Sequence, residues 1–184
     1  MNYATIKKFD IANGPGVRVS LFVSGCRHHC KNCFNKEAWD FNYGNPMTEE
    51  IENEILDACK ADHITGLSLL GGEPFEKENR AGLISLTKKF RELYPEKNIW
   101  CYTGFLLDEE LLKSRDSDIL ELLQNIDVLV DGRFVDELKS ASLLFRGSSN
   151  QRIIDVTETL KKGEVVLLPG KWERTMGSGD IYEA

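Results

Sequence analysis

The feature that most restricts the fold of this chain is an alternation of short apolar β-type runs with segments of helical periodicity. The apolar runs occupy residues 17–24, 67–70, 99–102, 128–130 and 165–168. Their nearly continuous apolar character is typical of strands buried on both faces. Apolar side chains recur at helical spacing in the segments between them, residues 47–60, 79–94 and 117–125. Strands that alternate with helices predict a parallel sheet with right-handed crossovers and helices on the outside.

The length of the chain decides how far such a sheet can close. A complete eight-unit barrel typically takes about 250 residues, and this chain has 184. We therefore expect an open partial barrel of the (β/α)6 type, with a doubly wound sheet as the alternative. No Pro-, Gly- or Ser-rich linker divides the sequence, which predicts a single domain over residues 1–184, with residues 156–184 as a C-terminal extension of open role. In either architecture ligands gather at the C-terminal ends of the strands.

Charge and cysteine content narrow the class of protein. The 23 basic and 30 acidic residues give a net charge of -7, which argues against a protein that follows nucleic-acid phosphates. The 5 cysteines are an odd number, and the sequence has neither a signal peptide nor an apolar run of transmembrane length. We therefore expect a reducing, cytoplasmic compartment, where clustered cysteines bind metal more often than they form disulfides. A soluble enzyme or a protein-binding module fits these limits.

Three of the cysteines, Cys26, Cys30 and Cys33, follow the first predicted strand at the spacing C-x3-C-x2-C. Three thiolates can bind one inorganic centre, but a closed structural zinc site or a standard iron–sulfur site has four protein ligands. The missing ligand indicates an open coordination position, and an open position suggests chemistry at the metal.

Two alternatives to this interpretation stay open from the spacing alone. One is a structural zinc site with His28 or His29 as the fourth ligand. The other is a chance clustering of cysteines without any metal. The two remaining cysteines, Cys59 and Cys101, lie on a predicted helix face and in a predicted strand, and we expect both to be small core residues.

A second unusual loop, Gly71-Gly72-Glu73-Pro74, directly follows another predicted strand. Two glycines let the backbone approach a ligand closely, and a neighbouring carboxylate can hold an ammonium group. The simpler alternative is a turn between strand and helix. The Lys-Ser/Thr pair of a phosphate loop is missing. Because both unusual loops follow predicted strands, we expect them to share one rim of the sheet.

These two loops together resemble a known enzyme family. Residues 24–34 (SGCRHHCKNCF) resemble the C-x3-C-x2-C-aromatic loop of radical S-adenosylmethionine enzymes, and residues 71–74 resemble their GGEP motif. Residues 13–18 (NGPGVR) are similar to the DGPGVR segment of glycyl-radical-enzyme activases, with Asn13 in place of Asp. Further segments resemble the activases of anaerobic ribonucleotide reductases, namely residues 33–35 with Trp39, 100–104, 127–134 and 146–152. The resemblance extends from about residue 5 to residue 155.

The resemblance implies a cofactor arrangement. Three irons of a 4Fe-4S cluster would be bound by Cys26, Cys30 and Cys33, and the open fourth iron would bind the amino and carboxylate groups of S-adenosylmethionine. For S-adenosylmethionine, the resemblance places the adenine near Phe34 and against the backbone of Asn32, Cys33 and Phe34. It places the ammonium group at Gly71, Gly72 and Glu73. It also implies polar contacts from Asp131 and Arg133. For the last two residues, ordinary surface charges are the alternative.

The family also implies an activity, that of an oxidoreductase that activates a glycyl-radical enzyme. Reductive cleavage of S-adenosylmethionine gives a 5'-deoxyadenosyl radical, which abstracts hydrogen from a glycine of the partner. This chemistry needs no side-chain acid or base, so no catalytic residue is assigned. The implied partner is the large glycyl-radical subunit of an anaerobic ribonucleoside-triphosphate reductase. No nucleic-acid or membrane partner is expected.

With only two cysteines outside the motif, the sequence has no second cluster to relay electrons, so we expect reduced flavodoxin or ferredoxin as the donor. Three alternative functions stay open. The chain could activate another glycyl-radical enzyme, such as pyruvate formate-lyase, or it could act on a small molecule. From a different class, it could be a zinc-stabilised interaction module, although such a module has no use for an ammonium-binding turn beside the metal.

Overall fold

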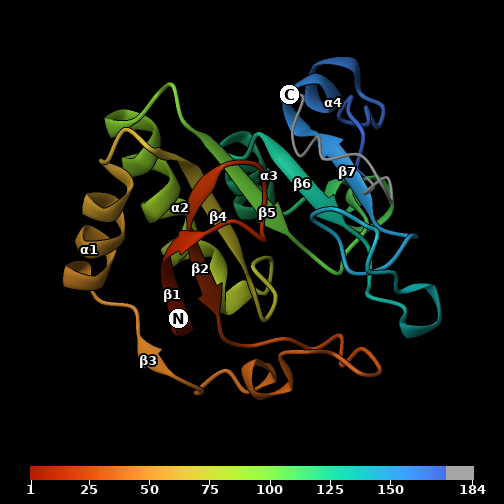
Figure 1. The fold of residues 1–184 in the computed structure, drawn as a ribbon, viewed down its shortest axis with the longest axis horizontal. Helices are drawn as coiled ribbons and strands as arrows, with labels where there is room; N and C mark the ends of the chain where they lie inside the picture. The colour runs from red at the N-terminus through yellow and green to blue at the C-terminus, as the bar shows by residue number, and fades with distance from the viewer. Residues whose placement is uncertain (173–184) are drawn as a thin grey trace.

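The computed structural model of the protein describes residues 1–172, and residues 173–184 lie outside the described part. The described residues form a seven-stranded sheet in the order β3-β1-β2-β4-β5-β6-β7 (Figure 1). The strands are β1 (Asn2–Asp10), β2 (Val17–Val23), β3 (Asn45–Pro46), β4 (Ile64–Gly71), β5 (Asn98–Tyr102), β6 (Val128–Asp131) and β7 (Arg152–Asp155).

Four α-helices accompany the sheet: α1 (Glu49–Cys59), α2 (Lys77–Leu93), α3 (Ser117–Gln124) and α4 (Val156–Lys162). Local sequence explains where two of them begin. The Thr48 side chain accepts a hydrogen bond from the backbone of Ile51 at the start of α1, and Asp116 caps α3 in the same way. Short helical turns are η1 (Lys36–Trp39), η2 (Leu107–Leu111), η3 (Leu112–Ser114) and η4 (Asp136–Leu138). None of the helices within residues 1–172 is both long enough and apolar enough to cross a bilayer.

The expectation of an open parallel barrel of the (β/α)6 type is wrong, because the sheet is mixed. The neighbours β2, β4, β5 and β6 run parallel, whereas β1 pairs antiparallel with β2 and β3, and β7 pairs antiparallel with β6. The connections explain the difference. Only residues 11–16 separate β1 from β2, and a parallel crossover takes a dozen or more residues. Residues 132–151 join β6 to β7 with no helix longer than the turn η4, so no helical crossover forms there.

The elements at the centre of the sheet were predicted correctly. β2, β4, β5 and β6 confirm the first four predicted strands, and α1, α2 and α3 confirm the three predicted helices within a few residues at each end. The fifth predicted strand, residues 165–168, is wrong as a strand, since it forms only an isolated bridge between Leu167 and Ile154.

The two faces of the sheet have different roles. Alternate strand residues, among them Leu21, Leu69 and Cys101, join side chains from all four helices in one large apolar core. The doubly wound alternative is therefore not observed, because the helices contribute to the core of one face. Trp100, Val130 and other residues of the opposite face form a second, smaller cluster. Beside this cluster no helix covers the sheet within the described residues, which leaves room for a cavity.

The strand register brings the two unusual loops together, as the sequence predicted. Val23, the last residue of β2, pairs with Gly71, the last residue of the parallel neighbour β4. The cysteine loop and the Gly71–Pro74 loop therefore leave the sheet at the same rim. In Figure 1 the segment between β2 and β3, drawn in orange, runs along the bottom of the view.

Arg18 fastens the opposite end of the parallel strands. Its side chain is fully buried, and its Nε donates to Ser68 Oγ at 2.7 Å. The remaining nitrogens donate to Asn98 Oδ1 at 2.8 Å and to the carbonyl oxygen of Leu67 at 2.8 Å. Burial lowers the pKa of this guanidinium to about 10. One side chain thus joins β2, β4 and β5 through neutral acceptors.

We expect the substitution Arg18→Met to lower the free energy of unfolding by about 3 kcal/mol, because several buried acceptors lose their donor together. For Arg18→Lys the free energy of unfolding should lie between those of Arg18→Met and the unchanged protein, since one ammonium group cannot reach all of these acceptors. Lys113→Met, at an exposed position, is the control and should change the free energy by less than about 0.5 kcal/mol. Denaturant unfolding measures all three, and an Arg18→Met midpoint equal to that of the unchanged protein would contradict the role of this side chain.

Candidate functional site

The cysteine loop starts at the end of β2 and turns back on itself twice. Cys26 is buried, whereas Cys30 and Cys33 are half-buried. The turns occur at His29 and Asn32, whose φ angles of 50° and 57° lie in the left-handed region. Residues other than glycine seldom adopt this conformation, and where they do, it is often at a functional site. The curled loop that one shared metal centre requires is therefore present.

The tip of the loop is bound to the segment that follows β6. Lys31 Nζ pairs with Glu137 at 2.7 Å, and Asn32 Nδ2 donates to Asp136 Oδ2 at 2.7 Å. Both acidic residues belong to η4. The loop thus spans from β2 to the far side of the sheet, although exposed ion pairs of this kind contribute little to stability.

Backbone N–H groups are directed at the cysteine sulfurs. The N–H groups of His28 and His29 point to the sulfur of Cys26, and the N–H of Asn35 donates to Cys33 Sγ at 3.4 Å. Such hydrogen bonds lower the energy of a negatively charged sulfur and tune the potential of a bound cluster.

The thiols themselves are held in their protonated form by burial. Burial raises the pKa of Cys26 to about 11 and also raises the pKa of Cys30, although a backbone N–H from Phe134 acts in the opposite direction on Cys30. At neutral pH these thiols therefore keep their protons unless a metal displaces them.

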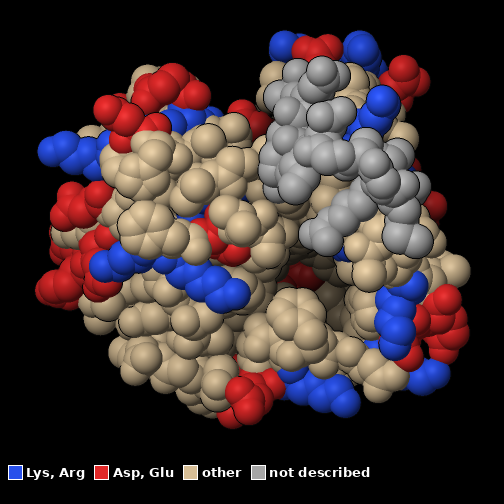
Figure 2. Space-filling model, viewed as in Figure 1, with Lys and Arg blue, Asp and Glu red and all other residues tan. Residues whose placement is uncertain are grey.

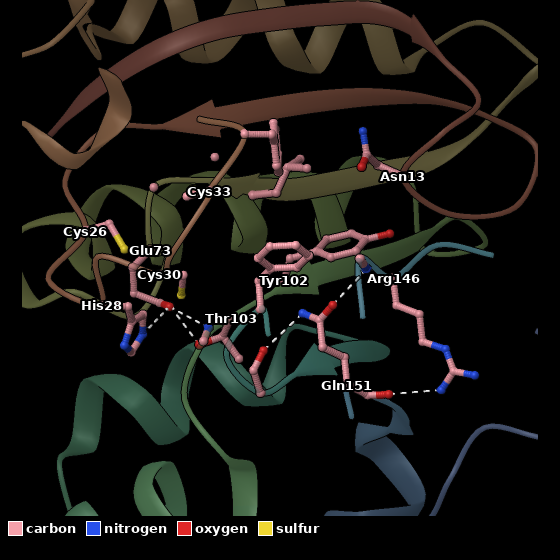
Figure 3. Close-up of a pocket in the computed structure, with 18 of the residues that line it drawn as sticks. Asn13, Cys26, His28, Cys30, Cys33, Glu73, Tyr102, Thr103, Arg146 and Gln151 are labelled. Atoms are coloured by element: carbon pink, nitrogen blue, oxygen red, sulfur yellow. Dashed lines mark hydrogen bonds and ion pairs between the residues drawn. The ribbon is translucent and has the colours of Figure 1, made fainter. Parts of the chain in front are cut away.

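Glu73 is the best-connected side chain of the site, and it is 1% exposed. Its Oε1 accepts from the N–H of Phe75 at 2.9 Å and from the hydroxyl of Thr103 at 2.7 Å. Its Oε2 accepts from the N–H of Gly104 at 2.7 Å and lies 2.9 Å from Nε2 of His28 (Figure 3). A carboxylate with four hydrogen-bonding partners is a strongly held group.

Through these contacts Glu73 connects the cysteine loop to the strands beside it. His28 comes from the cysteine loop, Glu73 follows β4, and Thr103 follows β5. The His28 ring packs edge-on against Phe105, with 4.4 Å between ring centroids. The carboxylate therefore fixes three rim segments relative to one another. Its sequence-predicted contact with an ammonium group stays a prediction.

Gly71 and Gly72 lie close to the backbone of the neighbouring strand. The N–H of Gly72 donates to the carbonyl of Val23 at 2.7 Å, and the N–H of Glu73 donates to the carbonyl of Gly25 at 2.8 Å. A Cβ on Gly72 would come within 2.5 Å of that Gly25 oxygen. The two glycines thus allow close packing against β2 and the cysteine loop, and both also line the cavity described next.

A cavity of about 470 Å³ opens on the face of the sheet that the helices leave free. Figure 2 shows a recess near the centre of the molecule in the same view as Figure 1. All three cysteines of the loop line the cavity. The other described residues that line it include Asn13, Asn32, Phe34, Trp39, Gly71, Gly72, Glu73, Tyr102, Thr103, Phe134, Leu143, Leu144, Phe145, Arg146 and Gln151.

Two polar groups stand at the far part of the cavity, away from the cysteines (Figure 3). The Tyr102 hydroxyl is buried and has no hydrogen-bond partner within the described chain. The Asn13 side chain donates to Asp10 Oδ2 at 2.6 Å, which fixes its amide at the edge of the cavity. An orphaned hydroxyl in a cavity is a natural contact for a polar ligand.

Asp131 and Arg133 are not among the described residues that line the cavity, although Gly132 between them is. Asp131 is fully buried and accepts from Arg152 Nε at 2.9 Å and from the N–H of Leu107 at 2.9 Å. Arg133 is largely exposed and lies 3.7 Å from Glu110. The charge of Arg133 acts on Cys30, where it opposes the rise of the thiol pKa, so Arg133 stands beside the cysteine loop. Asp131 is held by Arg152 and Leu107 instead. Contacts of either residue with a cofactor stay predictions.

Comparison with known proteins decides the family. The family of 4Fe-4S single cluster domains matches residues 12–154. The anaerobic ribonucleoside-triphosphate reductase-activating protein of Escherichia coli K12 is 44% identical over 153 residues, which cover 82% of this chain and 96% of that protein. This chain belongs to the family of anaerobic ribonucleoside-triphosphate reductase-activating proteins.

Other members of the activating-protein family are similar over comparable lengths. The Pasteurella multocida protein is 42% identical over 160 residues, which cover 86% of this chain and 99% of that protein. The enterobacteria phage T4 protein is 37% identical over 162 residues, which cover 88% of this chain and 99% of that protein. The domain match includes both the cysteine loop and residues 71–74.

For this member of the activating-protein family, the zinc alternative gains no support from the histidines. His28 is held by Glu73, and the His29 ring stacks on Trp39 with 4.5 Å between centroids. Within residues 1–172, no three or more His, Cys, Asp or Glu side chains are grouped as ligands of a single metal ion.

Sequence reasoning missed several residues of the site. The sequence indicates His28 only as an alternative zinc ligand, and its contact with Glu73 across 45 positions has no local signal. Tyr102, Thr103 and Gln151 lie in segments that resemble the activating-protein family, and that resemblance was the available signal. The left-handed Phe145, with φ of 56°, had none.

Proposed function

We propose that this chain activates an anaerobic ribonucleoside-triphosphate reductase, with a 4Fe-4S cluster bound by Cys26, Cys30 and Cys33 and with S-adenosylmethionine as cosubstrate. The observation that carries the proposal is that all three cysteines line one cavity together with residues 71–73. Relatives of 37–44% identity that are named as activating proteins of this reductase support the choice of partner.

The residues present fit such a cluster. Cysteine thiolates are the usual ligands of 4Fe-4S clusters, and three of them leave one iron without a protein ligand. The N–H groups directed at Cys26 and Cys33 suit metal-bound sulfur. The unpartnered hydroxyl of Tyr102 supports a polar cosubstrate in the same cavity.

When bound, the cluster would supply one electron to S-adenosylmethionine, whose C–S bond would break to give methionine and a 5'-deoxyadenosyl radical. That radical would take a hydrogen atom from a glycine Cα of the reductase, leaving 5'-deoxyadenosine and a glycyl radical. The chain's own residues bind, orient and exclude water. Glu73 and His28 hold the cysteine loop against the rim of the sheet. Apolar side chains of Phe134 and Leu143 line the cavity and keep water from a reactive radical.

Contacts with S-adenosylmethionine are proposed for residues of the cavity lining. We assign the adenine to the side of Asn32, Cys33 and Phe34, and the ammonium group to Gly71, Gly72 and Glu73, because all six line the cavity. Phe34 is 85% exposed, so a stacked adenine would cover an apolar ring that now faces solvent. Asp131 and Arg133 are left out of this assignment because neither belongs to the described lining.

The electron donor is proposed to be a separate protein. Cys59 and Cys101 are both 0% exposed within the helix-side core, so neither supports a second cluster in the described chain. A reduced flavodoxin or ferredoxin in a reducing cytoplasm fits this arrangement.

Anaerobic reconstitution tests the proposed chemistry before any partner is added. We expect about four iron and four sulfide per chain, and, with dithionite and S-adenosylmethionine, equal amounts of 5'-deoxyadenosine and methionine. A colourless protein with bound zinc would refute the proposal. So would an iron-loaded protein that forms no 5'-deoxyadenosine.

A further inference from the structure

The segment after α4 packs onto the outer edge of the sheet, although it lies beyond the residues 12–154 that the family match covers. The N–H of Asp155 donates to the carbonyl of Val166 at 2.9 Å, and the N–H of Leu168 donates to the carbonyl of Ile153 at 2.9 Å. Residues 163–172, which we call the C-terminal strap, therefore follow β7 with backbone hydrogen bonds instead of leaving the domain.

The strap ends at Trp172, which folds back onto the cavity side of the sheet. The N–H of Leu144 donates to the carbonyl of Trp172 at 2.9 Å, and the indole N–H donates to the carbonyl of Leu168 at 3.0 Å. Gly170, with φ of 150°, makes the fold possible, since a Cβ there would lie 2.7 Å from the indole ring. Trp172 is thus held at its backbone and at its ring.

The indole ring completes a cluster of three aromatic side chains. The ring centroid of Trp172 lies 5.9 Å from that of Trp100 and 6.0 Å from that of Phe145, and those two rings lie 5.6 Å apart. All three pairs have the edge-to-face geometry that aromatic rings prefer. Leu168 and Trp172 of the strap belong to the small apolar cluster on this face.

Phe145 is the residue that most needs such support. Its φ of 56° is left-handed, which is unfavourable for a bulky side chain unless the surroundings fix it. Leu144 and Phe145 both line the cavity, whereas Trp172 is not part of the described lining and stands behind them. The strap therefore supports this wall from outside the cavity.

We infer that the C-terminal strap supports the cavity from outside and that Trp172 is a positioning residue, which holds the wall formed by Leu144 and Phe145 where the reductase polypeptide would lie. The inference rests on the proposed function. The wall is apolar, and Arg146, which follows it directly in the chain, lies away from Cys26 and Cys30 in Figure 3. This end of the cavity therefore suits a peptide segment of the partner. A displaced wall should weaken partner binding without changing the cluster.

Two measurements on Trp172→Ala separate these ends of the cavity. Iron content and the rate of 5'-deoxyadenosine formation without partner should stay within about twofold of the unchanged protein. The reductase concentration that gives half-maximal glycyl radical should rise about tenfold, because two aromatic contacts behind the wall are lost. Gly170→Ala displaces the same ring without removing it and should raise the half-maximal concentration in the same direction. It also serves as the test if Trp172→Ala does not fold.

Leu167→Ala is the matched control, since Leu167 belongs to the same strap but is 59% exposed. It should leave both readouts unchanged. The inference is overturned if the half-maximal concentration stays constant in both test variants, or if 5'-deoxyadenosine formation without partner falls as much as activation does. Failure of the unchanged protein to form 5'-deoxyadenosine would instead refute the proposed function.

Discussion

Cys30→Ala is expected to abolish cluster loading, with iron and sulfide falling from about four per chain to less than about one after anaerobic reconstitution. Cys30 is half-buried in the curled loop and lines the cavity with the other two cysteines of the motif. With three protein ligands the proposed site is already one short, so the loss of another leaves too few thiolates to retain a cluster. Chemical iron and sulfide analysis, with the visible absorbance of the protein, measures the effect.

Cys101→Ala is the matched control for this experiment. Cys101 is a cysteine of the same chain, but it lies in β5 within the helix-side core at 0% exposure. Removing its sulfur should cost about 1–2 kcal/mol of stability and leave the iron content unchanged. A Cys30→Ala protein that keeps its iron and still forms 5'-deoxyadenosine would contradict the ligand assignment.

Glu73→Gln is expected to lower the free energy of unfolding by about 3 kcal/mol. The buried carboxylate has four hydrogen-bonding partners, and the amide that replaces it has one oxygen that accepts and one nitrogen that can only donate. Each carboxylate oxygen accepts from one backbone N–H, Oε1 from Phe75 and Oε2 from Gly104. Whichever oxygen the amide nitrogen replaces, one buried N–H loses its acceptor. Denaturant unfolding measures this loss.

The same substitution should reduce 5'-deoxyadenosine formation by about 10–100-fold, as substitutions behind a metal site typically do. Glu73 holds the cysteine loop through His28, so the loop should shift when this contact weakens. Glu92→Gln, which changes an exposed carboxylate at the far end of the neighbouring helix α2, is the control. It should alter stability by less than about 1 kcal/mol.

A different outcome would assign Glu73 another role. If Glu73→Gln keeps the stability of the unchanged protein and only weakens binding of S-adenosylmethionine, then the carboxylate acts mainly on the ammonium group, as the sequence indicates. The bracing role that its four protein partners suggest would then be wrong.

The sequence predicted the centre of the fold but not its edges. β2, β4, β5 and β6 are nearly continuous apolar runs, and the helices between them have clear periodicity, so local pattern was sufficient. β1 carries polar, exposed residues such as Lys7 and Lys8, and β3 has only two residues. β1 pairs antiparallel with β2 through the short connection of residues 11–16, and β3 pairs antiparallel with β1, and periodicity reveals neither pairing. The parallel barrel was wrong for this reason.

The candidate site likewise has a part that the sequence predicted and a part that it did not. The gathering of Cys26, Cys30 and Cys33 at one cavity was predictable because they are close in sequence and follow one strand. The contact of Glu73 with His28 and the packing of Trp172 behind Phe145 join positions far apart in the chain. Such contacts depend on the folded arrangement of several elements, and no local pattern encodes them.

Electron paramagnetic resonance with the proposed partner tests the central claim most directly. The reconstituted chain is mixed anaerobically with an anaerobic ribonucleoside-triphosphate reductase, S-adenosylmethionine and dithionite, and pyruvate formate-lyase takes the place of the reductase in a parallel sample. We predict a glycyl-radical signal with the reductase, accompanied by 5'-deoxyadenosine, and no such signal with the Cys30→Ala protein. A signal that arises only with pyruvate formate-lyase, or no protein radical with either partner, would contradict the claim.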